Sequence, residues 1–192
     1  MNLEDAIDLA FRVDEPAPRP RTAYWDELPS PIGPLMVATG EDRRVRRISF
    51  RLGRESFVDD LLARGWLPLR DREANDALER QLEEYFDRAR TGFELEVDLS
   101  TVTPFTRSVL EAAARVPRGG WSTYSGIAAA IGRPAAARAV GNALGDNPIP
   151  IVIPCHRILA AGGRIGGYAS GLPDGLQIKR TLLALEGVPP PR

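Results

Sequence analysis

The stretch that most restricts the fold of this chain is residues 147–157, an apolar run interrupted by three prolines that ends in Cys155, His156 and Arg157. Each proline removes a backbone donor and fixes φ, so the run fits neither a helix nor a central strand. We therefore predict a rigid extended loop. Cys155 is the only cysteine and His156 the only histidine of the chain, and their adjacency suggests a reactive site. The alternative is a buried structural cysteine beside a surface histidine.

The composition limits the class of protein. With 192 residues and 43% hydrophobic content, the chain can bury the core of one large or two small domains. One cysteine excludes an internal disulfide, and one cysteine with one histidine cannot build a Cys/His zinc site, so we expect no metal and no cofactor. The chain has no apolar run of about 18 residues and no signal peptide pattern. We expect a soluble cytoplasmic protein without a membrane partner.

Charge is divided unevenly along the chain. The net charge is −1, but residues 1–100 carry −7 and residues 101–192 carry +6. The positive C-terminal half predicts moderate, salt-sensitive binding to a polyanion such as nucleic acid. An ordinary charge imbalance between two domains is the alternative.

The N-terminal half has strand-like and helical segments in alternation. Residues 3–12 have helical spacing, and prolines up to residue 20 then predict an extended linker. Short apolar segments bounded by Pro, Gly and Asp predict an antiparallel meander, with strands at 22–28, 33–39 and 45–51. Amphipathic helices are predicted at 54–65 and 72–90, and a further strand at 93–99.

The C-terminal half has a mainly helical pattern. Thr103 and Pro104 predict the N-cap and first turn of a helix that runs to about residue 115, so we place a domain boundary near residue 100. Two short helices at 125–131 and 135–144, joined by a turn with glycine, predict a helix-turn-helix, and a helix at 176–186 ends the chain. We expect an α+β fold with an extension at 1–20, an α/β domain at 21–100 and a helical domain with an active-site loop at 101–192.

The second helix of the predicted helix-turn-helix consists mostly of residues with small side chains. Only Arg138 and Asn142 have side chains that can reach a base edge, which is too few for readout in the major groove. Small side chains allow close backbone approach, which favours the minor groove with Arg138 as a wedge. An alanine-rich helix packed in the core is the alternative.

One group of motifs surrounds the Pro-Cys-His-Arg sequence at 154–157, which is specific in this context. The flanking motifs are Thr103-Pro104-Phe105, Pro117, Tyr124, Ile127-Ala128, the segment 136–141, Asn147-Pro148, Gly166-Gly167-Tyr168 and the segment 182–187. Together they resemble the O6-alkylguanine-DNA alkyltransferases. Residues 103–187 match densely and 22–100 only loosely.

The resemblance implies a single-turnover repair protein that moves the alkyl group of O6-alkylguanine, and of O4-alkylthymine, onto its own Cys155. The expected partner is double-stranded DNA containing the lesion, read with little sequence specificity by a monomer; cooperative binding along DNA is left open. The implied catalytic residues are Cys155, His156, Glu186, Asn147 and Tyr124. The implied DNA contacts are Tyr124, Ala135, Ala136, Arg138, Ala139 and Asn142. The implied pocket residues are Pro150, Ile158, Tyr168, Ala169 and Ser170.

A mechanism follows from these residue types. A thiol in apolar surroundings has a raised pKa, so Cys155 is expected to rest protonated and to need a base. Adjacent side chains on an extended chain point apart, so we expect His156 to reach Cys155 through a water, with Glu186 orienting the imidazole. In the family, Asn147 braces this network. Tyr124 is expected to press on the 3′ phosphate of a rotated-out nucleotide and to protonate guanine N3, while Arg138 fills the gap in the duplex.

The pocket loop departs from the family pattern. Ser170 stands where a glycine is usual, and Pro173 belongs to a short insertion before the last helix. We predict that Ser170 narrows the pocket against bulky O6-benzyl adducts.

Three other functions compete with repair. Alkyltransferase-like lesion sensors bind alkylated DNA without repairing it, but the presence of Cys155 argues against that role. A Cys/His hydrolase of another fold usually has its histidine far from the cysteine in sequence. A transcription regulator of the adaptive response would carry a cysteine-rich N-terminal module, which this chain lacks.

Overall fold

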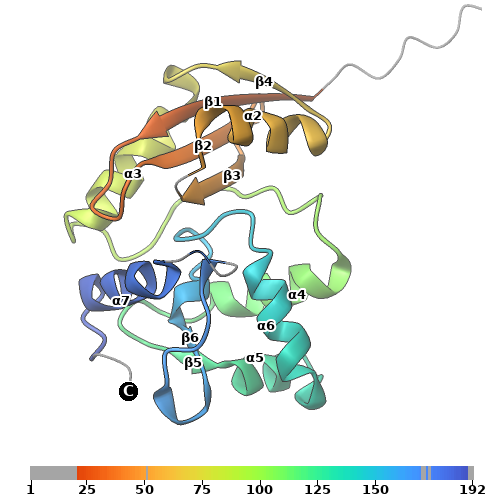
Figure 1. The fold of residues 1–192 in the computed structure, drawn as a ribbon, viewed down its shortest axis with the longest axis vertical. Coiled ribbons are helices and arrows are strands. Elements are labelled where there is room, and N and C mark those ends of the chain that lie inside the picture. Colours follow the sequence, from red (N-terminus) through yellow and green to blue (C-terminus); the bar gives the residue numbers. More distant parts are fainter. Residues whose placement is uncertain (1–20, 51, 170–171, 173, 190–192) are drawn as a thin grey trace, which may run out of the picture.

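The computed structural model describes residues 21–50, 52–169, 172 and 174–189, and it confirms the mixed α/β fold (Figure 1). The predicted helix at 3–12 and its linker lie outside the described residues. A four-stranded sheet forms the N-terminal part, in the order β3-β2-β1-β4. Its strands are β1 (Arg21–Leu28), β2 (Leu35–Gly40), β3 (Val45–Phe50) and β4 (Trp66–Arg70).

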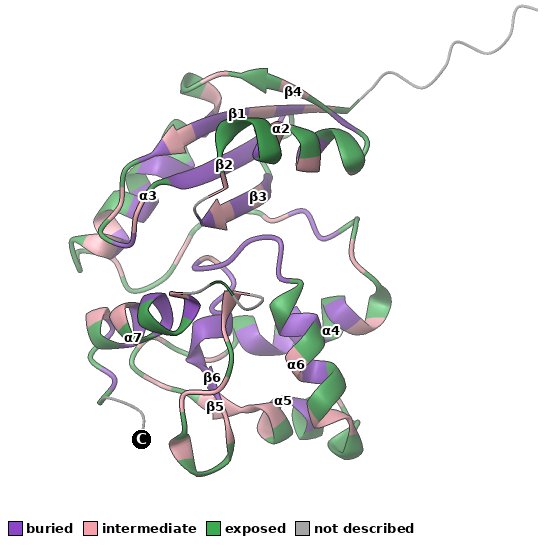
Figure 2. Ribbon diagram, viewed as in Figure 1, coloured by how far each residue is buried: buried purple, intermediate pink, exposed green. Residues whose placement is uncertain are grey.

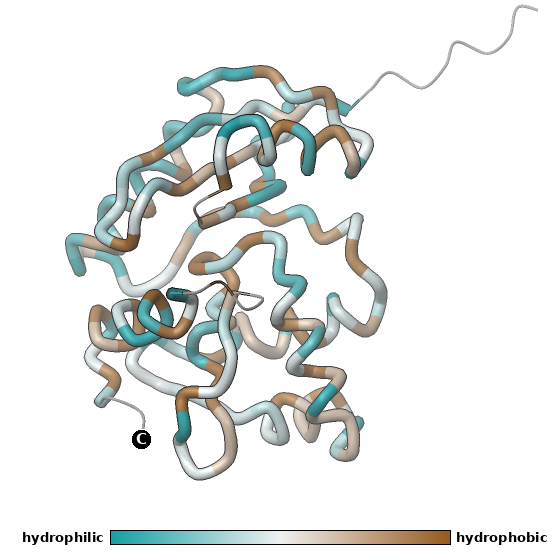
Figure 3. The backbone as a smooth tube through the Cα atoms, in the orientation of Figure 1, coloured by the Kyte–Doolittle hydropathy of each residue, from teal (hydrophilic) through white to brown (hydrophobic). Residues whose placement is uncertain are grey.

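Helices cover both faces of this sheet. Helix α2 (Arg54–Ala63) packs on one face through Phe57 and Leu61, which join a cluster with Trp25 and Trp66. Helix α3 (Asp76–Phe86) packs on the other face, where its buried side chains meet those of β2 and β3. All six residues of β2 are therefore buried (Figure 2). Hydrophobic and hydrophilic segments alternate along the helices, as expected for elements with one buried face (Figure 3).

The N-terminal part differs from the sequence prediction in three elements. Strand β4 was not predicted, and because it pairs parallel with β1 the sheet is more than an antiparallel meander. The strand predicted at 93–99 is wrong: within the described chain, this segment makes only an isolated bridge between Val45 and Val97. The side chain of Gln81 bonds both the N–H and the C=O of Glu94, so these groups are not available to a ladder. The helix predicted at 72–90 is shorter, a 3₁₀ turn (Glu73–Asn75) followed by α3.

The C-terminal part contains the predicted helices. Helix α4 (Pro104–Ala114) starts at an N-cap where the Thr103 hydroxyl accepts from the Thr106 N–H at 3.1 Å. The helix-turn-helix consists of α5 (Tyr124–Ala130), a 3₁₀ turn η2 (Pro134–Ala136) and α6 (Ala137–Gly145). Strands β5 (Ser122–Thr123) and β6 (Ile158–Leu159) form a short parallel pair, and α7 (Gly175–Leu185) is the last helix. None of the described helices is long and apolar enough to cross a membrane.

Residues 147–154, which we call the active-site loop, lie where the two parts meet (Figure 2). The N–H of Ile48 in β3 donates to the carbonyl oxygen of Pro148 at 2.9 Å, and the Arg47 guanidinium donates to the same oxygen at 3.3 Å. The sheet therefore supports the loop directly, although the two segments are about a hundred positions apart in sequence.

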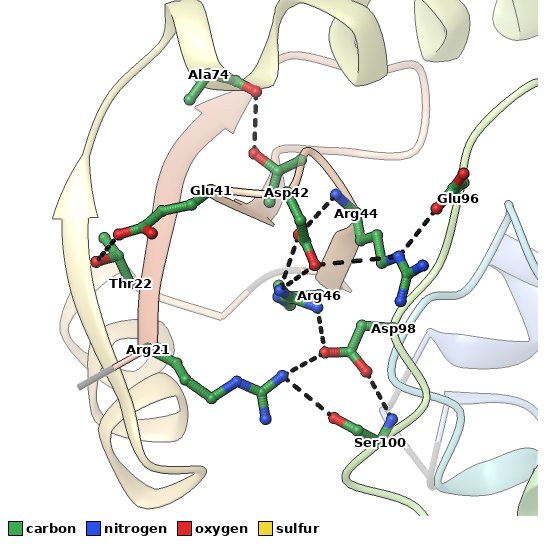
Figure 4. Close-up of polar contacts among 11 residues, drawn as sticks. Arg21, Thr22, Glu41, Asp42, Arg44, Arg46, Ala74, Glu96, Asp98 and Ser100 are labelled. Atoms are coloured by element: carbon green, nitrogen blue, oxygen red, sulfur yellow. Dashed lines mark hydrogen bonds and ion pairs between the residues drawn. The ribbon is translucent and has the colours of Figure 1, made fainter. Parts of the chain in front are cut away.

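A second link runs through the buried guanidinium of Arg46 (Figure 4). Arg46 is ion-paired with Asp98, and its other nitrogen donates to both oxygens of Asp42 at 2.8 and 2.9 Å. Asp98 also accepts from Arg21 at 2.8 Å and from the N–H of Ser100 at 2.7 Å. This cluster joins the segment around Asp98, which leads into the C-terminal part, to the edge of the sheet.

We predict that Arg46→Met lowers the free energy of unfolding by about 3 kcal/mol, because it leaves the buried Asp98 without its main partner. Urea denaturation measures this change. The neighbouring Arg44→Met is the matched control, because Arg44 is half exposed in its ion pair with Glu96 and its loss should cost much less. Equal losses of unfolding free energy for the two variants would contradict a stabilising role of the buried Arg46–Asp98 pair.

Candidate active site

Cys155 begins a 3₁₀ turn (Cys155–Arg157) directly after the active-site loop and is 7% exposed. The side-chain amide of Asn147 donates to the Cys155 Sγ at 3.1 Å and to the carbonyl of Ile153 at 2.9 Å. The Asn147 Oδ1 accepts from the N–H of Ile149 at 3.0 Å. Asn147 thus holds both ends of the loop and the sulfur together.

Burial raises the pKa of the Cys155 thiol, and the amide of Asn147 and the charge of Lys179 offset this only in part. The resting side chain is therefore a thiol at neutral pH, as predicted. Lys179, the only lysine of the chain, donates to the carbonyls of Ile158 at 2.6 Å and Gly167 at 3.1 Å. Burial lowers the pKa of Lys179 to about 8, although a Cys155 thiolate would raise it. The sequence did not indicate Lys179 as part of the site.

His156 and Glu186 are completely buried and in contact. The His156 Nε2 lies 2.9 Å from the Glu186 Oε1. Arg157 donates to both oxygens of Glu186, at 2.8 and 2.9 Å, and to the carbonyl of Val116 at 2.6 Å. The sequence motif contained Arg157 but gave no sign that it would neutralise Glu186. Tyr85 of α3 also donates to the Glu186 Oε1, at 2.7 Å, and nothing in the sequence marked this residue.

These contacts set the charges of the pair. Burial opposes the ionisation of Glu186, but hydrogen bonds from His156 and Arg157 outweigh it and hold the pKa of this carboxyl well below its usual range. Burial lowers the pKa of His156, because it disfavours the charged imidazolium. Glu186 opposes this shift, and the positive charge of Arg157 adds to it. The imidazole is therefore neutral at pH 7. A carboxylate only accepts, so Nε2 carries the ring proton, and Nδ1, which has no hydrogen-bond partner in the described chain, is an acceptor.

A cavity of about 480 Å³ opens onto Cys155. Tyr124, at the start of α5, forms one wall, and its hydroxyl donates to the carbonyl of Gly167 at 3.3 Å. A Cβ at Gly166 would lie 2.9 Å from this hydroxyl, so the close approach needs glycine there. The remaining lining residues come from α6 and from the loop before α7: Gly141, Asn142, Leu144, Gly145, Asp146, Gly167, Tyr168 and Ala169.

The predicted pocket residues are not all at this cavity. Tyr168 and Ala169 line it, and burial raises the pKa of Tyr168 well above its usual value. Pro150 lines a second cavity of about 490 Å³, which reaches Cys155 from the side of the sheet. Ile158 is fully buried away from both, and its carbonyl already accepts from Lys179. Ser170 lies outside the described residues.

The helix-turn-helix presents its small side chains outward. Val140, Ala143 and Leu144 of α6 are buried against the core. The predicted DNA contacts Ala135, Arg138, Ala139 and Asn142 are exposed, and Ala136 is half-buried. Because Asn142 also lines the cavity, this outer face is continuous with the opening to Cys155.

We predict that the free energy of unfolding falls as the pH drops below about 6.5, the usual pKa of histidine. The pKa of His156 is lower in the folded than in the unfolded chain, so the unfolded chain binds the proton first as the pH falls. The folded state is therefore fully stabilised above about pH 6.5 and loses stability below it. The slope approaches about 1.4 kcal/mol per pH unit. Urea denaturation across this range measures it. His156→Gln removes the only histidine and should remove this slope; the same slope in both proteins would contradict a neutral buried imidazole.

Comparison with known proteins shows the family of the chain. Residues 104–188 match the family model described as 6-O-methylguanine DNA methyltransferase, DNA binding domain. A methylated-DNA–protein-cysteine methyltransferase of Methanosarcina barkeri is 39% identical over 85% of this chain and 96% of its own length. The constitutive protein of that name from Bacillus subtilis is 35% identical over 86% and 96%.

Solved structures show the same relationship. The O6-methylguanine methyltransferase of Mycobacterium tuberculosis has a TM-score of 0.72 at 36% identity, covering 86% of this chain and 93% of its own. A structure of the M. tuberculosis protein in complex with DNA has a TM-score of 0.71 at 36% identity, covering 85% and 92%. These relatives confirm the resemblance and do not favour the lesion-sensor alternative. The chain belongs to the methylated-DNA–protein-cysteine methyltransferases, the O6-alkylguanine-DNA alkyltransferase family.

Proposed function

We propose that this DNA repair protein transfers the alkyl group from O6 of guanine, and from O4 of thymine, to the Sγ of its own Cys155, once per molecule. The observation that carries this proposal is the place of the only thiol of the chain. Cys155 lies at the cavity that joins the outer face of the helix-turn-helix, beside a neutral imidazole held by an ionised carboxylate. A thiol, a base and an acid that orients the base are the parts that nucleophilic catalysis needs.

The proton of the thiol leaves through His156. Its Nδ1 accepts a proton from Cys155 through a bridging water, while Glu186 stabilises the imidazolium that forms. The thiolate then attacks the alkyl carbon, so that an S–C bond forms as the C–O6 bond breaks. The departing guanine takes a proton from the Tyr124 hydroxyl at N3, and the proton held by His156 restores the tyrosine. The products are S-alkylcysteine and guanine, with no change in net charge.

The target base must leave the duplex before it can react. O6 of a stacked guanine lies out of reach of a buried thiol, and the cavity at Cys155 has about 480 Å³ for a rotated-out base. We propose that the outer face of η2 and α6 enters the minor groove, that Arg138 occupies the gap in the stack, and that Tyr124 presses on the 3′ phosphate. Exposed alanines on this face permit the close approach of the backbone to DNA.

DNA is the partner of this family. We propose that this protein prefers O6-alkylguanine, acts as a monomer and works in the bacterial cytosol. We also propose the division into an appended segment at 1–20, a supporting domain at 21–100 and a DNA-binding domain at 101–192. The hydrogen bonds from β3 and α3 to the site support the role given to residues 21–100.

We predict that restoration of guanine in a duplex with one O6-methylguanine rises linearly with added protein and stops at one guanine per protein molecule. A restriction enzyme that cuts only the repaired sequence measures the restored fraction. Cys155→Ser, which keeps a side chain of similar shape, should restore none. Repeated turnover would refute transfer to the protein itself. Lesion-selective binding without any restoration would identify a sensor.

We predict that Arg138→Ala slows repair of duplex DNA by about tenfold or more, because an unfilled gap leaves the rotated-out state unsupported. Repair of the same lesion in a single strand should change little, since no stack has to be opened. Arg180→Ala is the matched control, with the same change of charge on the exposed side of α7. Equal slowing on single and double strands would contradict the wedge role.

A further inference from the structure

We propose that Tyr85, on helix α3 of the N-terminal part, is a positioning residue for alkyl transfer: it fixes Glu186 so that His156 keeps its Nε2 proton and presents Nδ1 as the base. This inference rests on the proposed function and adds a residue from the other part of the molecule to its machinery. Tyr85 touches neither the sulfur nor the cavity at Cys155 and acts only through Glu186.

The hydroxyl of Tyr85 is held rigidly at the carboxylate. Its distance to the Glu186 Oε1 is 2.7 Å, and the tyrosine is 1% exposed. The ring packs against Phe86 and Phe93, with centroid distances of 5.3 and 5.4 Å. The guanidinium of Arg118 lies 5.1 Å from the ring centroid and donates to main-chain carbonyls on both sides, those of Arg90 and Leu185. The ring therefore cannot turn away without disturbing several contacts.

The donor count at Glu186 gives this hydroxyl a specific effect. An ionised carboxylate only accepts, so Tyr85 donates. Among the described residues, Oε1 receives three donors, from Tyr85, His156 and Arg157, whereas Oε2 receives only the Arg157 Nε. The three donors share the electron density of one oxygen. Tyr85 thus limits how strongly Glu186 can stabilise a charged His156, while its hydrogen bond holds the carboxylate in place.

Loss of the hydroxyl should make His156 more basic. The charged and titratable groups around the imidazole are Glu186, Arg157, Lys179 and, through Glu186, Tyr85. With one donor removed from Oε1, the hydrogen bond between the carboxylate and the imidazolium strengthens. More of the protein then has a protonated His156 at mildly acid pH, and a protonated imidazole cannot take the proton of Cys155.

The test is Tyr85→Phe, which removes one oxygen and keeps the ring. We expect the single-turnover rate on O6-methylguanine DNA to fall about tenfold at mildly acid pH, with the acid limb of the pH–rate profile moved to higher pH. Tyr24→Phe, a change of the same kind in β1, is the matched control and should leave the profile unchanged. In a Glu186→Gln background, Tyr85→Phe should have little further effect, because its route to His156 is already broken.

A second readout does not depend on transfer. His156 is the only histidine, so ¹⁵N NMR of the ring reports its tautomer and its titration without overlap. We expect the Nε2–H tautomer in the wild type and titration at higher pH in Tyr85→Phe. An unchanged titration and pH–rate profile, with only a lower melting temperature, would show that Tyr85 merely packs and would overturn the proposal. If the wild type transfers no alkyl group, the proposed function fails, and the NMR titration still decides the role of Tyr85.

Discussion

The arrangement of this protein depends on one buried charge, the carboxylate of Glu186. A carboxylate without water needs donors for its lone pairs, and here they come from three places: Arg157 and His156 beside the thiol, and Tyr85 from the N-terminal part. Removing any one partner would leave the buried charge partly uncompensated, which is costly. The same contacts that satisfy Glu186 also orient His156 and join helix α3 to the end of α7. One set of hydrogen bonds therefore both stabilises the fold and orients His156.

The active-site loop follows the same principle on a smaller scale. Its prolines remove backbone donors and stiffen the chain, and the polar groups that remain bond to the Asn147 side chain and to strand β3. Asn147 bonds Ile149 and Ile153 across the loop, and β3 bonds Pro148. This rigidity places the sulfur at the edge of a cavity rather than in the middle of the core. A reactive thiol can then be buried enough to stay protonated and still meet a nucleobase that enters from the side of the helix-turn-helix.

Much of the site could be predicted because its residues lie in a local motif. Cys155, His156 and Asn147 fall within ten positions, and Glu186 precedes the glycine that follows α7. Tyr85 and Lys179 could not be predicted, because only tertiary packing brings α3 and the buried face of α7 to the site. Strand β4 was missed since Pro68 interrupts its apolar run, which an edge strand tolerates. The segment at 93–99 has the alternation of a strand, but the Gln81 side chain takes the backbone groups of Glu94, and within the described chain the segment pairs with β3 only at Val45.

The central claim is that the alkyl group ends on Cys155. The most direct measurement is the intact mass of the protein after incubation with duplex DNA that carries one O6-methylguanine, followed by peptide mapping. The account predicts a gain of one methylene per molecule, located on the peptide with Cys155 and absent from Cys155→Ala. An unchanged mass after the lesion has been removed from DNA, or a methyl group on another residue, would contradict it.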